Sequence, residues 1–213
     1  MKPSLTIIGS GWVGTHILND YYHMFDNIIT TSKSSPAHSR SNGHFFLDIY
    51  KKDHLSLPTT DVCLITIPFS RQLKNPDDYF SSISHLVSQL PVYKKILFTS
   101  STSIYKKNNA IVNELSETDT SDRAKALLKT ENIIKTTNSI NFILRISGIC
   151  GFDRNSKQKV SKSEIYDSNH PVNLVHIKDI SQTFETLLSD RYQTSDIINV
   201  TATEHPSKED YYR

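Results

Sequence analysis

Three glycines near the start of the chain have the spacing of a phosphate-binding turn. The apolar run 5–8 enters Gly9-Ser10-Gly11-Trp12-Val13-Gly14, and a helix-compatible segment follows over residues 15–22. In this pattern Gly9 makes the tight turn out of a strand, Gly11 lets backbone amides approach a pyrophosphate, and Gly14 lets the helix pack close to the sheet. Phosphates would then meet unpaired amides and the positive end of the helix dipole. The sequence predicts that these six residues bind a dinucleotide; the alternative is a glycine turn without a ligand.

A second group of polar residues bears on which dinucleotide binds. In dinucleotide-binding folds an acid at the end of the second strand accepts hydrogen bonds from the adenosine ribose, whereas a cation and hydroxyls suit a 2′-phosphate. Here the second strand-like run ends in Thr30-Thr31-Ser32-Lys33-Ser34, and the nearby Asp26 precedes the run. Ser32 and Lys33, with help from Arg40, therefore favour NADP over NAD. The alternative is a solvated polar loop.

Two further segments are predicted to line the cofactor. Asp48 ends the third strand-like run, over 44–48, where it would lie near the adenine or act as the N-cap of the following turn. Ile67 ends the fourth run, over 62–67, and Pro68 stops the strand. In this topology that end lies beside the pyrophosphate and the nicotinamide ribose.

Strand and helix patterns alternate along the chain. Strands are predicted over 28–31, 44–48, 62–67, 95–100, 141–146, 172–177 and 197–200, and helical spacing appears over 77–90, 121–136 and 179–188. This alternation predicts an α/β fold with a doubly wound parallel sheet. Ligands would bind at the carboxyl ends of its strands.

Length and composition predict one Rossmann-type domain over 1–213. The polar stretch 152–171 is expected to be a loop or lid, and with 201–213 it would form a reduced substrate lobe. The net charge of +2 gives no strong case for nucleic acid or an anionic membrane. Cys63 and Cys150 read as reduced thiols, and the nine histidines have no metal-ligand spacing. With no apolar run of membrane-spanning length and no signal peptide, the expected location is cytoplasmic.

The order of several motifs resembles the extended and atypical short-chain dehydrogenases, often called NAD-dependent epimerase/dehydratases. The resemblance covers nearly the whole chain. It rests on the glycine turn and on segments 98–105 (Phe-Thr-Ser-Ser-Thr-Ser-Ile-Tyr), 144–151 (Leu-Arg-Ile-Ser-Gly-Ile-Cys-Gly), 173–179 (Asn-Leu-Val-His-Ile-Lys-Asp) and 198–200 (Ile-Asn-Val). It implies a Rossmann sheet with a reduced C-terminal substrate lobe, because the lobe of the family usually continues past the position of Arg213.

The resemblance also implies site residues, and one departure from it. Ser101 matches the family's catalytic hydroxyl, which would hydrogen-bond a substrate oxygen beside the nicotinamide. Glu131 matches the Glu that follows the family's Tyr-x-x-x-Lys, which puts Arg123 at the tyrosine position and Leu127 at the lysine position. The catalytic pair is therefore absent, since a permanently charged arginine makes a poor general base. Tyr105 is the candidate substitute acid.

These features predict an NADP-binding oxidoreductase or epimerase/dehydratase. Hydride would pass between nicotinamide C4 and a carbinol or carbonyl carbon of a small molecule or nucleotide sugar, with Ser101 positioning the oxygen. The missing Tyr and Lys leave an alternative, a non-catalytic dinucleotide-binding redox sensor or partner-binding scaffold. A homodimer through helices 77–90 and 121–136 is possible by resemblance, whereas nucleic acid, a membrane and a metal are not expected.

Overall fold

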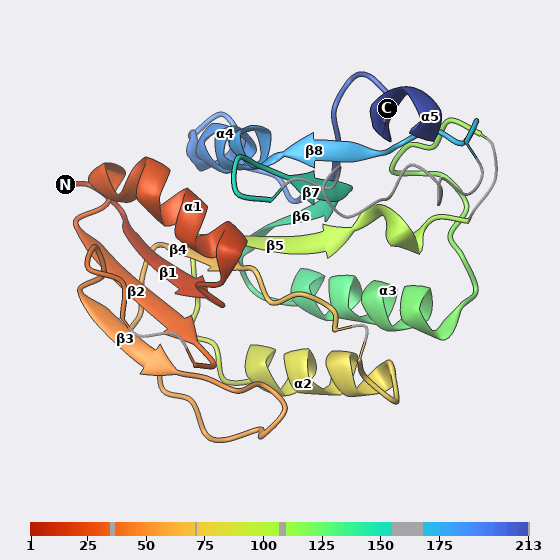
Figure 1. The fold of residues 1–213 in the computed structure, drawn as a ribbon. Helices are drawn as coiled ribbons and strands as arrows, with labels where there is room; N and C mark the ends of the chain where they lie inside the picture. The colour runs from red at the N-terminus through yellow and green to blue at the C-terminus, as the bar shows by residue number, and fades with distance from the viewer. Residues whose placement is uncertain (35–36, 71, 107–109, 155–167, 213) are drawn as a thin grey trace.

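A seven-stranded parallel sheet forms the centre of the molecule (Figure 1). The computed structural model describes residues 1–34, 37–70, 72–106, 110–154 and 168–212. The strand order is β3-β2-β1-β4-β5-β6-β9. The strands are β1 (Ser4–Ile8), β2 (Asn27–Ser32), β3 (Gly43–Phe46), β4 (Val62–Ile65), β5 (Lys95–Ser101), β6 (Ile140–Ile146) and β9 (Asp196–Val200). The order reverses between β1 and β4, which makes a topological switch point at their carboxyl ends.

Helices cover both faces of the sheet, as the alternating pattern predicts. α1 (Trp12–Tyr21) and α4 (Ile177–Leu188) pack together on one face, and α2 (Asp77–Val87) and α3 (Asp122–Lys135) pack together on the other (Figure 1). Short 3₁₀ turns follow α1 and β5, η1 (Tyr22–Met24) and η2 (Thr102–Ile104), and α5 (Lys208–Tyr212) lies in the C-terminal segment. The α/β, doubly wound prediction is confirmed.

The central strands are apolar because both of their faces are buried. Val62 and Leu64 of β4 pack in the core beneath α1 and α4, whereas Cys63 and Ile65 pack in the core beneath α2 and α3. Every residue of β4 is buried. This explains why the strand reads as a continuous apolar run rather than an alternating one.

The structure differs from the sequence prediction after β6. The predicted strand 172–177 is the shorter β8 (Leu174–His176), which pairs with β7 (Gly148–Cys150) in a separate two-stranded parallel sheet. α4 begins at once with Ile177. Most of the expected lid, residues 155–167, lies outside the described residues.

A lysine at the amino end of β5 holds the C-terminal end of α4. Lys95 opens β5 and is 6% exposed, and its ammonium donates to the carbonyl oxygens of Leu187, Leu188 and Ser189 at 2.9, 3.3 and 2.7 Å. Burial lowers the pKa of Lys95. A cation in this position satisfies the last carbonyls of the helix and complements its dipole.

None of the helices in the described part of the chain has the length and apolar character to cross a membrane.

Candidate functional site

The glycine turn has the conformation that its sequence predicts. Gly9 leaves β1 with φ +89°, a left-handed value that favours glycine. Its carbonyl oxygen accepts hydrogen bonds from the amide of Gly11 at 2.7 Å and from the hydroxyl of Thr66. The chain therefore reverses tightly at the switch point, and the segment after β4 holds the turn in place.

Gly14 and Gly11 serve different purposes in this turn. A Cβ on Gly14 would lie 2.9 Å from the Gly9 oxygen and 3.0 Å from a methyl of Ile7, so α1 packs directly on β1. A Cβ on Gly11 would meet no heavy atom closer than 4.0 Å, which means that this side of the turn is open. The first amides of α1 have no acceptors within the helix. Open space beside them is what an anion needs in order to approach.

The remaining residues of the turn fix its position. The amide and hydroxyl of Ser10 both donate to the Thr31 carbonyl, at 2.6 and 2.9 Å, and the Gly9 amide donates to the Thr31 hydroxyl at 3.0 Å. Val13 packs against the core beneath α1. The side chains of Ser10 and Val13 thus support the turn from β2 and from the core.

Trp12 joins the turn to the segment after β7, a contact that the sequence analysis missed. Its indole N–H donates to the Asp153 carboxylate at 2.9 Å, and the Arg154 guanidinium lies 5.2 Å from its ring centre. A Cβ on Gly151 would lie 2.9 Å from the indole, so glycine makes room for the ring. We call Trp12, Gly151, Asp153 and Arg154 the indole clasp. It places a cation next to the first turn of α1.

The ends of β2 and β3 bring together three predicted cofactor residues. The Lys33 ammonium lies 3.0 Å from the Asp48 carboxylate, and the Ser32 hydroxyl lies 3.2 Å from Nε2 of His44. Burial raises the pKa of Asp48, but Lys33 and the amide of Tyr50 outweigh it, and the pKa lies below its usual value. An acid is thus present at this corner after all. It comes from the end of β3 rather than from β2.

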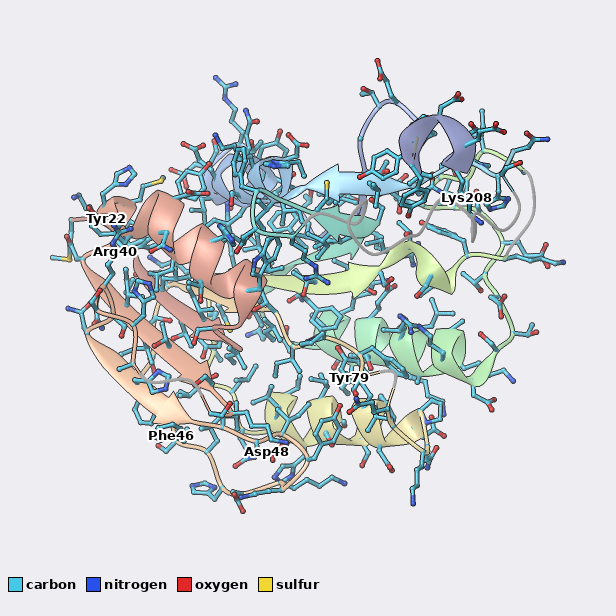
Figure 2. The ribbon with its side chains drawn as sticks, in the orientation of Figure 1. Tyr22, Arg40, Phe46, Asp48, Tyr79 and Lys208 are labelled. Atoms are coloured by element: carbon cyan, nitrogen blue, oxygen red, sulfur yellow. The ribbon has the colours of Figure 1, made fainter. Side chains whose placement is uncertain are left out.

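Arg40 lies away from this corner. Its guanidinium donates to the carbonyl and side-chain oxygens of Asn19 and stacks on Tyr22, 4.1 Å from the ring centre. These partners belong to the last turns of α1 and to η1, at the amino ends of the strands. Figure 2 shows Arg40 and Tyr22 together, well separated from Asp48. The expectation that Arg40 would help Lys33 is therefore wrong, because the connection between β2 and β3 carries it to the opposite edge.

The segment after β4 contacts Tyr79 on α2. Ile67 lies against the glycine turn, 3.0 Å from the position of a Gly9 Cβ, and its carbonyl accepts a hydrogen bond from Tyr79 at 2.9 Å. Pro68 is exposed, and the Phe69 ring packs edge-on against Tyr79 at 5.2 Å. Tyr79 is buried between the α2 and α3 ribbons (Figure 2). The predicted residues Ile67 and Pro68 thus lie at the carboxyl end of β4, beside the glycine turn.

Ser101 lies at the end of β5 with a second serine and an arginine. Its hydroxyl donates to the Ser103 hydroxyl at 3.0 Å and accepts from the Ser103 amide at 3.2 Å. The Nε–H of Arg123, on the first turn of α3, also donates to the Ser103 hydroxyl, at 3.3 Å. The Arg123 guanidinium lies 4.8 Å from the Phe69 ring centre. We call Ser101, Ser103, Arg123 and Phe69 the β5-end cluster; only Ser101 was predicted as a site residue.

Tyr105 belongs to a buried polar network instead of this cluster. Its hydroxyl donates to Asn199 at 2.7 Å and accepts from Arg145 at 2.9 Å, and the residue is 5% exposed. The Arg145 guanidinium also pairs with the buried Glu131 at 2.8 Å, and the Ser100 hydroxyl donates to Glu131 at 2.6 Å. The phenol is therefore engaged inside the protein. This placement favours a structural role over the substitute acid expected from the sequence.

Leu127, which stands at the position of the family's lysine, lies in the protein core. It is 2% exposed and packs in the core beneath α2 and α3. The residue one turn before it on α3 is Arg123, in the β5-end cluster. An ammonium at position 127 would have to be buried in this core, which is costly without a partner.

Comparisons with known proteins agree with this architecture. No family model matches the chain. Protein YeeZ of Escherichia coli K12 is 27% identical over 161 residues, which are 74% of this chain; the match spans only 58% of YeeZ. A putative NAD-dependent epimerase/dehydratase from Methylobacillus flagellatus superposes with a TM-score of 0.79 and 17% identity, over 100% of this chain and 80% of the other.

A UDP-glucuronic acid 4-epimerase from Bacillus cereus, solved with NAD, has a TM-score of 0.73 and 16% identity over 96% of this chain and 78% of its own. The NAD-dependent NDP-hexosamine 5,6-dehydratase TunA has a TM-score of 0.76 and 15% identity, over 98% and 78% of the two chains. These matches confirm the resemblance that the motifs carry. The chain has the Rossmann fold of the NAD-dependent epimerase/dehydratases.

Proposed function

We propose that this chain binds a nicotinamide dinucleotide along the carboxyl edge of its sheet. The observation that carries the proposal is the glycine turn: a left-handed Gly9, a Gly11 open to solvent and a Gly14 packed on β1, all at the start of α1. Backbone amides and the helix dipole at this point favour a pyrophosphate. The solved epimerase with NAD and the NAD-dependent dehydratase, which share the fold, support the same ligand class.

We further propose NAD as the preferred cofactor, in place of the NADP expected from the sequence. The Lys33 ammonium, which was expected to bind a 2′-phosphate, is paired with Asp48. A 2′-phosphate would lie close to the Asp48 carboxylate, whereas ribose hydroxyls could donate to it. Asp48, which follows β3, would thus accept hydrogen bonds from the adenosine ribose, as an acid at the end of the second strand does in other dinucleotide sites.

At the other end of the site, Ser101 is the residue proposed to hold the substrate oxygen. A bound nicotinamide would supply hydride chemistry, the conversion of an alcohol and a carbonyl into one another, as in an oxidoreductase or epimerase/dehydratase. The chain's part would be to orient the oxygen through the Ser101 hydroxyl. Because the Tyr105 hydroxyl is held by Arg145 and Asn199, the proton lost by the alcohol would pass to water.

A second candidate function is supported by the same observation on Tyr105 together with the buried Leu127. Without a phenol and an ammonium beside Ser101, the chain would bind the dinucleotide and act as a redox sensor or scaffold. Steady NADH consumption with small carbonyls, or conversion of a nucleotide sugar to its epimer or dehydration product in the presence of NAD, supports the enzyme. Tight binding without turnover supports the sensor.

The test of binding uses Trp12, the one tryptophan of the chain, as the reporter. Its fluorescence should be quenched saturably by NADH, and Gly11→Asp should weaken NADH at least about tenfold by placing a carboxylate against the pyrophosphate. Asp48→Asn should weaken NADH and strengthen NADPH, with Asp53→Asn as the matched control. Absence of saturable NADH binding to the parent would overturn the proposal. Tighter binding of NADPH than NADH by the parent would overturn only the choice of NAD.

A further inference from the structure

The first turn of α1 has no charged side chain with which to meet a pyrophosphate. Residues 12–14 are tryptophan, valine and glycine. Their amides and the helix dipole amount to about half a positive elementary charge, which is less than the charge of a pyrophosphate. Lys33 is paired with Asp48, and Arg40 donates to Asn19 near the other end of α1. A cation beside the first turn would therefore strengthen the binding of the cofactor.

Residues 151–154, directly after β7, form a tight turn whose two ends are joined by backbone hydrogen bonds. The Gly151 amide donates to the Arg154 carbonyl at 3.0 Å, and the Arg154 amide donates to the Gly151 carbonyl at 3.1 Å. A Cβ on Gly151 would lie 2.9 Å from the Trp12 indole and 3.1 Å from a methyl of Ile177, so the turn packs directly on α1 and on the start of α4. The backbone of Arg154 is therefore held next to the first turn of α1.

The Arg154 side chain contacts the indole and faces solvent. Its guanidinium lies 5.2 Å from the Trp12 ring centre, within the range of about 6 Å for a cation–π contact. Arg154 is exposed, so a ligand can approach it from solvent. A guanidinium carries N–H donors in a planar fork that matches two phosphate oxygens, and contact with a ring leaves the edge of the fork available for hydrogen bonds.

The neighbouring carboxylate, that of Asp153, holds the indole. One of its oxygens accepts from the Trp12 indole N–H at 2.9 Å, and the other lies 3.7 Å from Nε2 of His16. The hydrogen bond from Trp12 is the main reason that the pKa of Asp153 lies below its usual value. Asp153 thus positions the ring, whereas its negative charge opposes the approach of an anion. Within the indole clasp, the attraction for a phosphate comes from Arg154.

We propose that Arg154 binds the pyrophosphate of the dinucleotide, so that two segments, the glycine turn over 9–14 and the turn over 151–154, hold the phosphates. Trp12 directly follows Gly11, on whose open side the pyrophosphate is proposed to bind, and its indole carries the guanidinium. This inference rests on the proposed function and deepens it, because it adds a cofactor-binding residue that lies outside the glycine motif.

Calorimetric titration of NADH into the full chain tests the role of Arg154 without turnover. Arg154→Gln removes the charge and the fork, and it should weaken NADH at least about tenfold, as the loss of a charge-assisted hydrogen bond does. Arg154→Lys keeps the charge but loses the planar fork, so its affinity should lie between those of the parent and Arg154→Gln. Between about 50 mM and about 300 mM NaCl the parent should lose more affinity than Arg154→Gln, because salt screens the charge of the arginine.

Two further variants separate the charge of Arg154 from the packing of the indole clasp. Asp153→Asn keeps a side-chain oxygen that accepts from the indole but removes a negative charge beside Arg154, so it should bind NADH at least as tightly as the parent. Arg191→Gln is the matched control, because it removes an exposed arginine from the connection between α4 and β9. It should leave both the affinity for NADH and its salt dependence unchanged.

Equal affinity of the parent and Arg154→Gln for NADH would overturn the inference and leave the proposed function standing. An equal loss of affinity in Asp153→Asn and Arg154→Gln would also overturn it, because the packing of the clasp rather than the charge of Arg154 would then be responsible. A parent chain that does not bind NADH would overturn both proposals.

Discussion

Gly14→Ala adds one methyl group where α1 meets β1. The new Cβ would lie 2.9 Å from the Gly9 oxygen, 3.0 Å from a methyl of Ile7 and 3.1 Å from the Thr66 hydroxyl. The closest of these atoms is a backbone oxygen in a left-handed turn, and it already accepts hydrogen bonds from Gly11 and Thr66. The contact therefore cannot be relieved by rotating a flexible side chain.

Two effects of this substitution have opposite signs. Alanine in a helix interior is favoured over glycine by about 1 kcal/mol. Overpacking costs about 1–3 kcal/mol, and weakening a hydrogen bond to the Gly9 oxygen costs about 1 kcal/mol more. The packing effects outweigh the helix propensity, so the free energy of unfolding should fall by about 1–3 kcal/mol. Because the same turn presents the amides at the start of α1, NADH affinity should fall as well.

Urea unfolding followed by circular dichroism measures the stability, and Trp12 quenching measures NADH affinity. Gly43→Ala is the control: its Cβ would meet the end of the Ile29 side chain at 3.0 Å, an atom that can shift. A change of less than about 0.5 kcal/mol is expected there, as at an ordinary tolerant position. If Gly14→Ala is as stable as the parent and binds NADH equally well, the claim that the close packing of α1 on the turn requires glycine at position 14 is wrong.

Three further predictions concern ion pairs and the hydrogen-bonded phenol of Tyr105. Glu131→Gln should lower the free energy of unfolding by about 3 kcal/mol or more, because it leaves the buried guanidinium of Arg145 without its counter-charge; an unchanged urea midpoint would contradict this. The pKa of Asp61 is about 2, lowered by Lys94 and by the hydroxyl and amide of Ser4. Its contribution to stability is present above the ordinary carboxyl pKa and is lost as the pH falls toward 2, so Asp61→Asn should flatten the acid side of a plot of Tm against pH. Tyr105→Phe should lower stability by about 1–2 kcal/mol and leave NADH affinity unchanged, and a loss of turnover at unchanged stability would restore the phenol as an acid.

Local pattern was enough to predict the sheet and the glycine turn. β4 is buried on both faces and its sequence is apolar throughout, β6 is mostly apolar apart from Asn141 and Arg145, and the turn residues are dictated by backbone conformation within six positions. The end of β4 was less predictable. Thr66 has the composition of a strand residue, but it leaves the sheet and donates its hydroxyl to Gly9.

The polar contacts of the site could not be read from the sequence because they join distant segments. Lys33 meets Asp48 across the end of two strands, and Trp12 meets Asp153 over a separation of 141 residues. Tyr105 is a different case. The motif places it correctly after β5, but the direction of its side chain is set by Arg145 and Asn199, which come from two other strands.

The lysine that opens β5 has a consequence for how the molecule opens in solution. Its three carbonyl partners are 92 to 94 residues away, at the end of α4. A terminal turn without such an anchor frays in small local fluctuations, and its amides exchange their hydrogens quickly. Here fraying would leave the buried Lys95 ammonium without its carbonyl partners. The amide hydrogens of the last turn of α4 should therefore exchange only in the larger openings that also expose β5. The start of β5 and the last turn of α4, which lie 92 to 94 residues apart, thus form one cooperative unit held together by the Lys95 ammonium.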